Sequence, residues 1–336
     1  MGKEIVRKKI QVKNKPKQAD IPKKSKTSGI KDKIEKRAKE IKSVRKPKRL
    51  RTFEDTWETL ESFDENAKEV LGLKFLIYGL EKVGKSHLAH ETLNFLGYEG
   101  KTRIVPPGSP AFILDTEVGR SYEVSKQKFR EHLLNGSLKV KQCNIKDPIT
   151  KKTDKTQSLR ILTDWALSVL EKEEGTLIID TLTDFGDWLY SVLLTEVLPE
   201  DYGFDEWGAE IKKVAPFQYA WKKRENIDIL RALRDTKMNV IFIGQGKDEY
   251  EKPKKKKKGK KENVFDIKKT GAILPDVDPK TGHWVDVICL IEKDDITGKR
   301  KITITKSAFE DEVAEMIEIT EDISITGIVN AIKDKL

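Results

Sequence analysis

The segment from Leu73 to His90, LKFLIYGLEKVGKSHLAH, most constrains what this chain can fold into. The apolar and aromatic run from Phe75 to Tyr78 predicts a buried strand, and the residues after Ser86 have helical spacing. Between them lies G-x-x-x-x-G-K-S, which indicates a phosphate-binding loop only when a strand enters it and a helix leaves it. Both flanks are present, so a P-loop is favoured over a chance match in a lysine-rich chain.

The loop pattern assigns roles to its residues. Glycines let backbone N–H groups face the β- and γ-phosphates at a helix N-terminus, where an anion is favoured. Lys85 is expected to reach the β/γ oxygens, and the Ser86 hydroxyl to hold Mg²⁺. The predicted nucleotide-binding residues are Gly79, Leu80, Glu81, Lys82, Val83, Gly84, Lys85, Ser86 and His87. A zinc site at His87 and His90 is not favoured, because HLAHE is not HExxH and no cysteine lies nearby.

Charge is unevenly distributed along the 336 residues. Residues 1–52 hold 21 lysines and arginines against 5 acids, a net charge of +16, whereas the remainder carries −6. This first segment has no aromatic residue, so we expect a disordered tail that binds a polyanion such as nucleic acid, or only solubilises the chain. Two cysteines, no long apolar run and no hydrophobic leader lead us to expect a cytoplasmic protein without a membrane span.

Two further predicted strands end in acids. Ala111–Leu114 is followed by Asp-Thr-Glu117, and strand ends facing a phosphate loop are where open α/β sheets place their chemistry. Glu117 is therefore the candidate base that activates water, with a solvated turn residue as the alternative. Thr176–Asp180, TLIID, matches the Walker B pattern, in which Asp180 reaches Mg²⁺. A threonine rather than a glutamate follows it, so this strand supplies no base of its own.

A buried strand at Met238–Gly244 ends at Gln245, whose amide can hydrogen-bond a γ-phosphate and report its loss. A lysine-rich loop follows directly, which suggests a nucleotide-gated contact to nucleic acid, although such runs are usually only solvated loops. The predicted nucleic-acid-binding residues are Lys252, Lys254, Lys255, Lys256, Lys257, Lys258, Lys260 and Lys261.

The remaining pattern predicts further elements around these strands. Helices are expected at Phe53–Val70, Tyr122–Leu134, Ser158–Leu170 and Tyr219–Arg234, a short strand at Leu138–Cys143, and closing strands at Trp284–Leu290 and Lys301–Thr305. We divide the chain into the tail (1–52), a core (53–310) with an inserted helical, aromatic segment (185–217) and a lysine-rich loop (246–272), and a C-terminal helical cap (311–336).

The succession GLEKVGKS, FILDTE, LIIDTLT, VIFIGQ and a strand ending in ITK resembles the RecA/KaiC-like branch of P-loop ATPases. It is most similar to the compact RecA-like proteins of phages, archaeal viruses and archaea, over about residues 70–310. The resemblance implies an α/β fold with a mostly parallel central sheet flanked by helices, with antiparallel closing strands. It also implies ATP and Mg²⁺ as ligands, Glu117 as the water-activating residue and Gln245 as the sensor.

The resemblance further implies single-stranded DNA at the lysine-rich loop and assembly into a ring or filament, with a neighbour supplying a cation to the transition state. Relatives often carry two cations spaced by one residue after the last core strand, but Ser307 and Ala308 follow Lys306 here. The alternatives for the trans-acting cation are therefore Lys306 alone, Lys247, or no such cation.

Three classes of function are compatible with this pattern. The first is a DNA-dependent ATPase in recombination, strand annealing or a related transaction, and the second is an ATP-gated assembly or scaffold protein with negligible turnover. A P-loop kinase or GTPase comes last, because Gln245-Gly-Lys247-Asp248 is not the base-reading NKxD and no arginine-bearing lid is visible.

Overall fold

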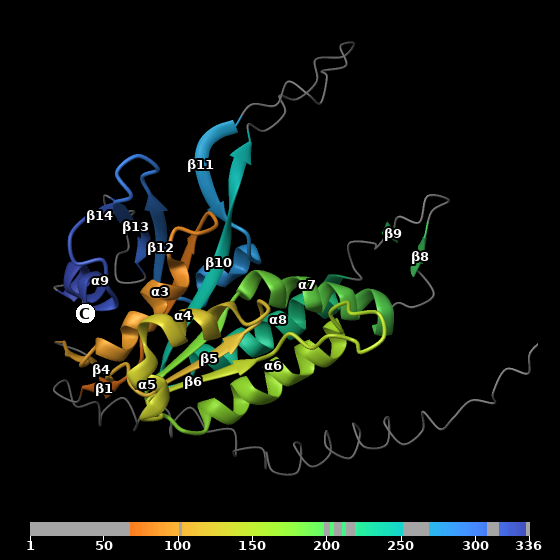
Figure 1. Cartoon of the computed structure of the whole chain (residues 1–336), viewed down its shortest axis with the longest axis horizontal. Coiled ribbons are helices and arrows are strands. Elements are labelled where there is room, and N and C mark those ends of the chain that lie inside the picture. The colour runs from red at the N-terminus through yellow and green to blue at the C-terminus, as the bar shows by residue number, and fades with distance from the viewer. Residues whose placement is uncertain are drawn as a thin grey trace, which may run out of the picture. The chain divides into compact units, whose positions relative to one another are not determined.

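A nine-stranded sheet forms the centre of the computed structural model (Figure 1). The structure describes residues 68–100, 103–197, 202–204, 210–212, 219–250, 269–307 and 316–333. The predicted tail, most of the predicted helix 53–70 and the lysine-rich run 252–261 lie outside these residues. Of two units along the chain, Met1–Glu65 and Asn66–Leu336, only the second contains described residues.

Most strands of the sheet are parallel. In spatial order they are β14 (Ile317–Ile319), β13 (Arg300–Ser307), β12 (Val287–Lys293), β2 (Lys74–Gly79), β10 (Asn239–Tyr250), β7 (Thr176–Asp180), β5 (Ala111–Asp115) and β6 (Leu138–Gln142). The strands from β12 to β6 run parallel to their neighbours, while β13 and β14 add antiparallel at one edge. β11 (Lys269–Pro275) pairs antiparallel with β10, so residues 246–250 and 269–272, predicted as the two ends of the lysine-rich loop, are strands instead. The predicted fold class, a mostly parallel sheet with antiparallel closing strands, is confirmed.

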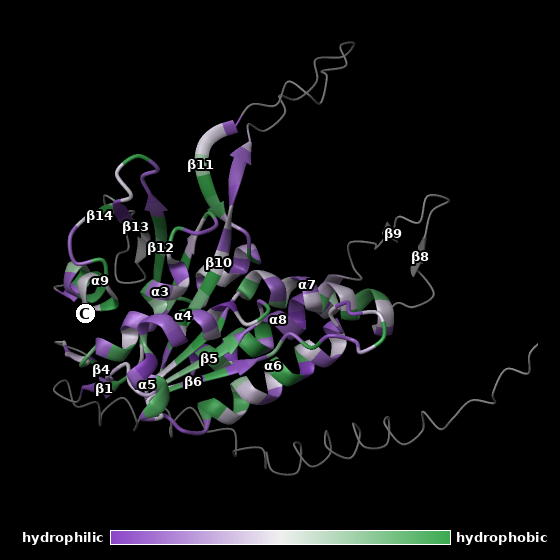
Figure 2. Cartoon of the chain, viewed as in Figure 1, coloured by the Kyte–Doolittle hydropathy of each residue, from purple (hydrophilic) through white to green (hydrophobic). Residues whose placement is uncertain are grey.

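Alternation along the strands divides the core into two layers. Phe75 and Ile77 of β2 face one layer, whereas Leu76 faces the other. The first layer is covered by α3 (Lys85–His90) and α9 (Ile325–Ile332), and the second by α6 (Lys155–Leu170), α7 (Leu182–Val192) and α8 (Tyr219–Arg234). In Figure 2, β5 and β12 are largely hydrophobic and α4 (Arg120–Lys128) is largely hydrophilic. Helices on both faces explain why the central strands are apolar almost throughout.

Register places the chemistry-bearing strand ends side by side. Gly79 of β2 pairs with Gln245 of β10, and Asp180 of β7 pairs with Asp115 of β5. Because these strands are parallel, their carboxyl ends meet at one edge of the sheet, where the P-loop leaves β2. The fold therefore gathers the residues that the sequence singled out one by one.

Several predicted elements differ from the structure. Glu69–Val70, predicted as the end of a helix, is strand β1, which pairs with β4 (Arg103–Val105) next to β3 (Tyr98–Glu99). The predicted helix 122–134 is broken at Phe129 into α4 and α5 (Arg130–Leu134). Strands of two or three residues are too short for a periodic signal, and their partners are distant in sequence, so the pattern could not find them.

Two segments that were predicted to be helical contain strands as well. The insertion 185–217, expected to be helical, continues α7 through a π-helical turn (Leu193–Val197) and then forms a hairpin of β8 (Tyr202–Phe204) and β9 (Glu210–Lys212). The C-terminal cap contains α9 but also β14, which exists because β13 offers it an edge. Among the described residues, no helix is both long and apolar enough to cross a membrane.

Candidate nucleotide-binding site

The P-loop between β2 and α3 is built around its second glycine. Gly84 has φ 105°, a left-handed conformation that favours glycine, and α3 begins at the next residue. The Lys85 ammonium lies over the loop, where Nζ donates to the carbonyl oxygens of Gly79 at 2.8 Å and Leu80 at 2.7 Å. Burial lowers the pKa of Lys85, while the charge of Asp180 opposes that shift.

The loop is joined to the end of β7 by two hydroxyl groups. Ser86 Oγ donates to Asp180 Oδ2 at 2.7 Å, and Ser121 Oγ of α4 donates to the same oxygen. Asp180 is buried, and burial raises its pKa while both hydroxyls lower it. The two predicted magnesium-binding residues, Ser86 and Asp180, are thus within hydrogen-bond distance of each other.

A second carboxyl group lies beside Asp180. Asp115 is fully buried, and burial together with the charge of Asp180 raises the pKa of Asp115 to about 7. Its Oδ2 accepts from the Ser121 backbone N–H at 3.1 Å, whereas its Oδ1 has no hydrogen-bond partner in the described part of the chain. Ser121 therefore bridges the two acids, one through its backbone and one through its hydroxyl.

The donor set fits magnesium. Mg²⁺ prefers hard oxygen ligands and is usually held by one or two protein groups together with phosphate and water oxygens. A serine hydroxyl and a carboxylate meet this requirement.

Among the described residues, no cluster of three or more His, Cys, Asp or Glu is arranged to hold a metal ion by itself. Both ring nitrogens of His90 are engaged, Nδ1 with Ser86 O at 2.5 Å and Nε2 with Ser125 Oγ at 2.7 Å.

A cavity of about 270 Å³ opens above the P-loop. It brings together most of the predicted site, including the candidate base and the candidate sensor. Its lining residues are Glu81, Lys82, Gly84, Lys85, Ser86, His87, Glu117, Arg120, Val124, Gln127, Lys128, Asp180, Thr181, Gln245 and Arg300. Of the predicted loop residues, Gly79, Leu80 and Val83 do not line it.

Two arginines that the sequence analysis did not single out line this cavity. Arg120 Nη1 lies 3.1 Å from Glu117 Oε2, and Arg300 Nε donates to Val83 O at 2.9 Å. Arg120 follows the DTE motif closely enough that its proximity to Glu117 could have been proposed. Arg300 and Val83 are 217 positions apart in the sequence, so no local sequence signal indicates their contact.

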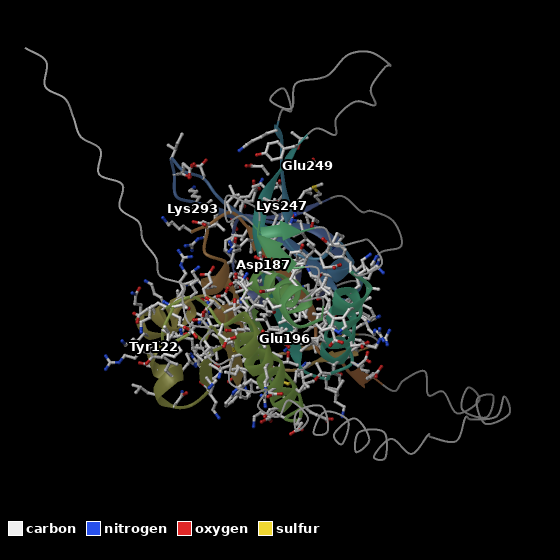
Figure 3. The ribbon with its side chains drawn as sticks, turned by 90° about the vertical axis from the view of Figure 1, so that its right-hand side faces the viewer. Tyr122, Asp187, Glu196, Lys247, Glu249 and Lys293 are labelled. Atoms are coloured by element: carbon white, nitrogen blue, oxygen red, sulfur yellow. The ribbon has the colours of Figure 1, made fainter. Side chains whose placement is uncertain are left out.

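Gln245 is held at the foot of the β10–β11 hairpin by backbone contacts. Its N–H donates to Thr183 Oγ1 at 3.0 Å, and its carbonyl accepts from Asp276 N at 2.7 Å. Lys247, two residues further, forms an ion pair with Asp276 at 2.7 Å. Figure 3 shows Lys247 and Glu249 on this hairpin. Lys247, one of two candidate trans-acting cations, is thus paired within its own chain.

The other candidates for nucleic-acid and trans contacts are less defined. The Lys306 backbone pairs with Ile288 in the β12–β13 ladder, but its side chain lies outside what the structure describes. The eight lysines of the loop that joins β10 to β11 also lie outside it. Their roles stay predictions from the sequence.

The strand order, the loop between β2 and α3, and the acid that ends β7 together define an α/β fold with a P-loop. No family model matches the sequence, and no curated protein matches it. Solved structures similar to it include the KaiC-like protein PH0186 from the hyperthermophilic archaeon Pyrococcus horikoshii OT3, with 11% identity over 75% of this chain and 92% of that one, at a TM-score of 0.37.

The RadB recombinase is similar at 14% identity over 75% of this chain and 89% of that one, with a TM-score of 0.38. A KaiC-like protein and a recombinase are thus among the solved structures to which this chain is similar.

Proposed function

We propose that this chain binds ATP with Mg²⁺ at the P-loop and hydrolyses it, and that it uses the nucleotide to act on nucleic acid. The observation that carries the proposal is the 2.7 Å contact between Ser86 Oγ and Asp180 Oδ2, at a cavity also lined by Lys85, Glu117 and Gln245. A phosphate cradle, a hydroxyl–carboxylate pair and a second carboxylate are the parts that phosphoryl transfer to water requires.

Each residue has a role that follows from its position. Lys85 leaves the Gly79 and Leu80 carbonyls to bind the β- and γ-phosphates. Ser86 and Asp180 would hold Mg²⁺, which would supply positive charge to neutralise the phosphate oxygens. Glu117 accepts the proton of the attacking water. Positioning and electrostatic stabilisation account for most of the rate enhancement in this chemistry, so the site must exclude bulk water and keep these groups fixed.

The link to nucleic acid is proposed from connectivity. β10 runs from the sheet through Gln245 to Tyr250, two residues before the lysine-rich run 252–261. A change in the Gln245 environment when the γ-phosphate is lost would therefore act on the strand that carries this segment. A lysine-rich segment binds phosphate backbones without reading sequence. We propose single-stranded DNA as the partner, in recombination, strand annealing or a related transaction, within a homo-oligomeric ring or filament.

One observation favours a second candidate function. Glu117 is paired with Arg120. If this ion pair persisted when ATP is bound, Glu117 could not act as the base, as expected for a protein in which ATP controls assembly and turnover is negligible. The two candidates differ in whether Glu117 matters for turnover.

The deciding experiment measures ATP turnover with and without single-stranded DNA, at about 50 and 200 mM salt. We expect stimulation by DNA that weakens at the higher salt and disappears in Lys85→Ala and in Glu117→Gln. Glu117→Gln should still bind ATP, since only the base is removed, and should lose roughly 10²–10⁴-fold in rate.

Loop variants separate DNA coupling from hydrolysis. Replacing Lys254 to Lys258 by serine should remove the DNA stimulation and leave basal turnover intact, whereas Lys151→Ser with Lys152→Ser, in an exposed turn, serves as the matched control. Tight ATP binding with flat turnover that neither DNA nor Glu117→Gln alters would instead support the ATP-controlled assembly protein.

A further inference from the structure

Arg300, at the first position of β13, lies flat against the P-loop. Its Nε donates to Val83 O at 2.9 Å. A Cβ atom added to Gly84 would lie 2.8 Å from Nε, 2.9 Å from Cζ and 3.0 Å from Nη2 of this guanidinium. Gly84 is therefore required for its backbone conformation, and the absence of a side chain there lets Arg300 approach the loop closely.

Among the described residues, the Arg300 guanidinium makes one hydrogen bond. It carries five N–H donors, of which the contact to Val83 O uses one. Among the described residues no carboxylate lies within ion-pair distance of Arg300, and no second hydrogen bond of its side chain is seen. The side chain is exposed and lines the nucleotide cavity beside Lys85 and His87. A cation without a neutralising acid on a phosphate-binding loop is an arrangement that binds anions.

The two arginines contact different parts of the site. Arg120 Nη1 lies 3.1 Å from Glu117 Oε2. Arg300 instead contacts the loop directly before α3 begins, at the Val83 carbonyl and beside Gly84. The backbone N–H groups of a P-loop cradle the α- and β-phosphates as well as facing the γ-phosphate, so a cation at the start of α3 lies near the part of the nucleotide that ATP and ADP share.

We propose that Arg300 is a second phosphate-binding cation of this site, supplied by the same chain, which contacts the α- and β-phosphates from the side of the β12–β13 hairpin. The inference rests on the proposed nucleotide-binding function and extends it to the part of the nucleotide that is recognised. Lys85 distinguishes a triphosphate through the β/γ oxygens, whereas Arg300 adds affinity for any nucleotide that carries a diphosphate. ADP is therefore held almost as firmly as ATP at this contact.

The competing explanation is that Arg300 only stabilises the conformation of the loop through its hydrogen bond to Val83 O. Arg300→Gln and Arg300→Lys separate the two. Glutamine removes the charge and keeps an N–H donor, while lysine keeps the charge but loses the planar fork. Lys293→Gln, at the position paired with Arg300 in the β12–β13 ladder, is the matched control for loss of a positive charge on this hairpin.

The test measures dissociation constants for ATP, ADP and AMP by titration calorimetry, together with the melting temperature of the nucleotide-free protein. We expect Arg300→Gln to weaken ATP and ADP alike by roughly tenfold, to affect AMP less, and to leave the melting temperature within about 2 °C. Lys293→Gln should bind all three as the wild type does. Arg300→Lys should recover part of the affinity for ADP.

Three results would overturn the inference. They are ADP binding by Arg300→Gln within twofold of wild type, a loss confined to ATP, and a loss in Arg300→Lys equal to that in Arg300→Gln with a lowered melting temperature in both. Failure of the proposed function is recognised separately, because the wild type would then bind neither ATP nor ADP.

Discussion

Glu117 and Arg120, which both line the cavity above the P-loop, form an ion pair with 3.1 Å between Oε2 and Nη1. The Arg120 side chain is 54% exposed and that of Glu117 is 23% exposed. Half-exposed pairs of this kind contribute about 1 kcal/mol or less. The candidate base is therefore restrained by a contact weak enough for a phosphate to displace.

Replacing Arg120 by alanine tests this restraint. We expect the KM for ATP to rise by about fivefold, because a cation near the phosphates is lost, while kcat stays within about twofold, because Glu117 itself remains. Steady-state turnover at saturating Mg²⁺ measures both, with Lys126→Ala, an exposed cation on the same helix, as control. A fall in kcat as large as that of Glu117→Gln would show instead that Arg120 acts in the transition state.

Ser121→Ala tests the support given to the magnesium-binding acid. The variant removes one of two hydroxyls that donate to Asp180 Oδ2, and residues that orient metal ligands typically contribute 10- to 100-fold in metal affinity. We expect half-maximal turnover to require about tenfold more Mg²⁺. Ser125→Ala is the control, because Ser125 Oγ contacts His90 and the Ser121 carbonyl but not Asp180. An unchanged magnesium requirement in Ser121→Ala would contradict the role.

The buried ammonium of Lys74 makes the free energy of unfolding depend on pH in the alkaline range. Its ammonium is buried and donates to the carbonyls of Gly72, Thr236 and Met238, and burial lowers the pKa of Lys74 to about 8. Below that pH the folded and unfolded states both hold the proton. Between pH 8 and 10.5, the ordinary pKa of a lysine, the unfolded state holds more protons, so the contribution of this group to the free energy of unfolding rises with pH.

Denaturant unfolding at pH 8, 9 and 10.5 measures the effect. Relative to Lys74→Met, the wild type should gain up to about 3 kcal/mol over this range. Parallel curves for the two proteins would mean that the proton is not lost in the folded state.

Asn239 anchors the start of β10. Its Oδ1 accepts from Leu73 N at 2.9 Å, and its Nδ2 donates to Pro106 O at 2.9 Å. Asn239→Leu leaves these buried groups without partners, at a cost of about 1–3 kcal/mol each. We expect the melting temperature to fall by roughly 5–10 °C, against little change in Asn94→Ala on the surface. A fall of less than 2 °C would show that the two backbone groups find other partners.

The sequence predicted those parts of the site that depend on local order along the chain. A strand, a glycine loop and a helix follow each other at residues 74–90, and Asp180 ends an apolar run, so each was visible within a short window. The contact of Ser86 with Asp180 was implied by the two motifs, and their register in a parallel sheet accounts for it.

Other contacts depend on which elements become neighbours, and a local pattern does not contain that information. Ser121 reaches Asp180 only because β5 lies beside β7, and Arg300 reaches Val83 only because β12 adds to the outer side of β2. The short strands β1, β3, β4 and β14 exist for the same reason, since each is defined by a partner rather than by its own alternation.

Strand β10 has a mechanical consequence. It is fixed between β2 and β7 in the sheet, pairs with β2 as far as Gln245, and extends five residues beyond it, to Tyr250, where β11 is its strand partner within the described part of the chain. At about 3.3 Å per residue this extension is about 17 Å long. A tilt of roughly 10° at its base, where Gln245 lines the nucleotide cavity, would displace the tip by about 3 Å, comparable to the rise between neighbouring residues of an extended strand.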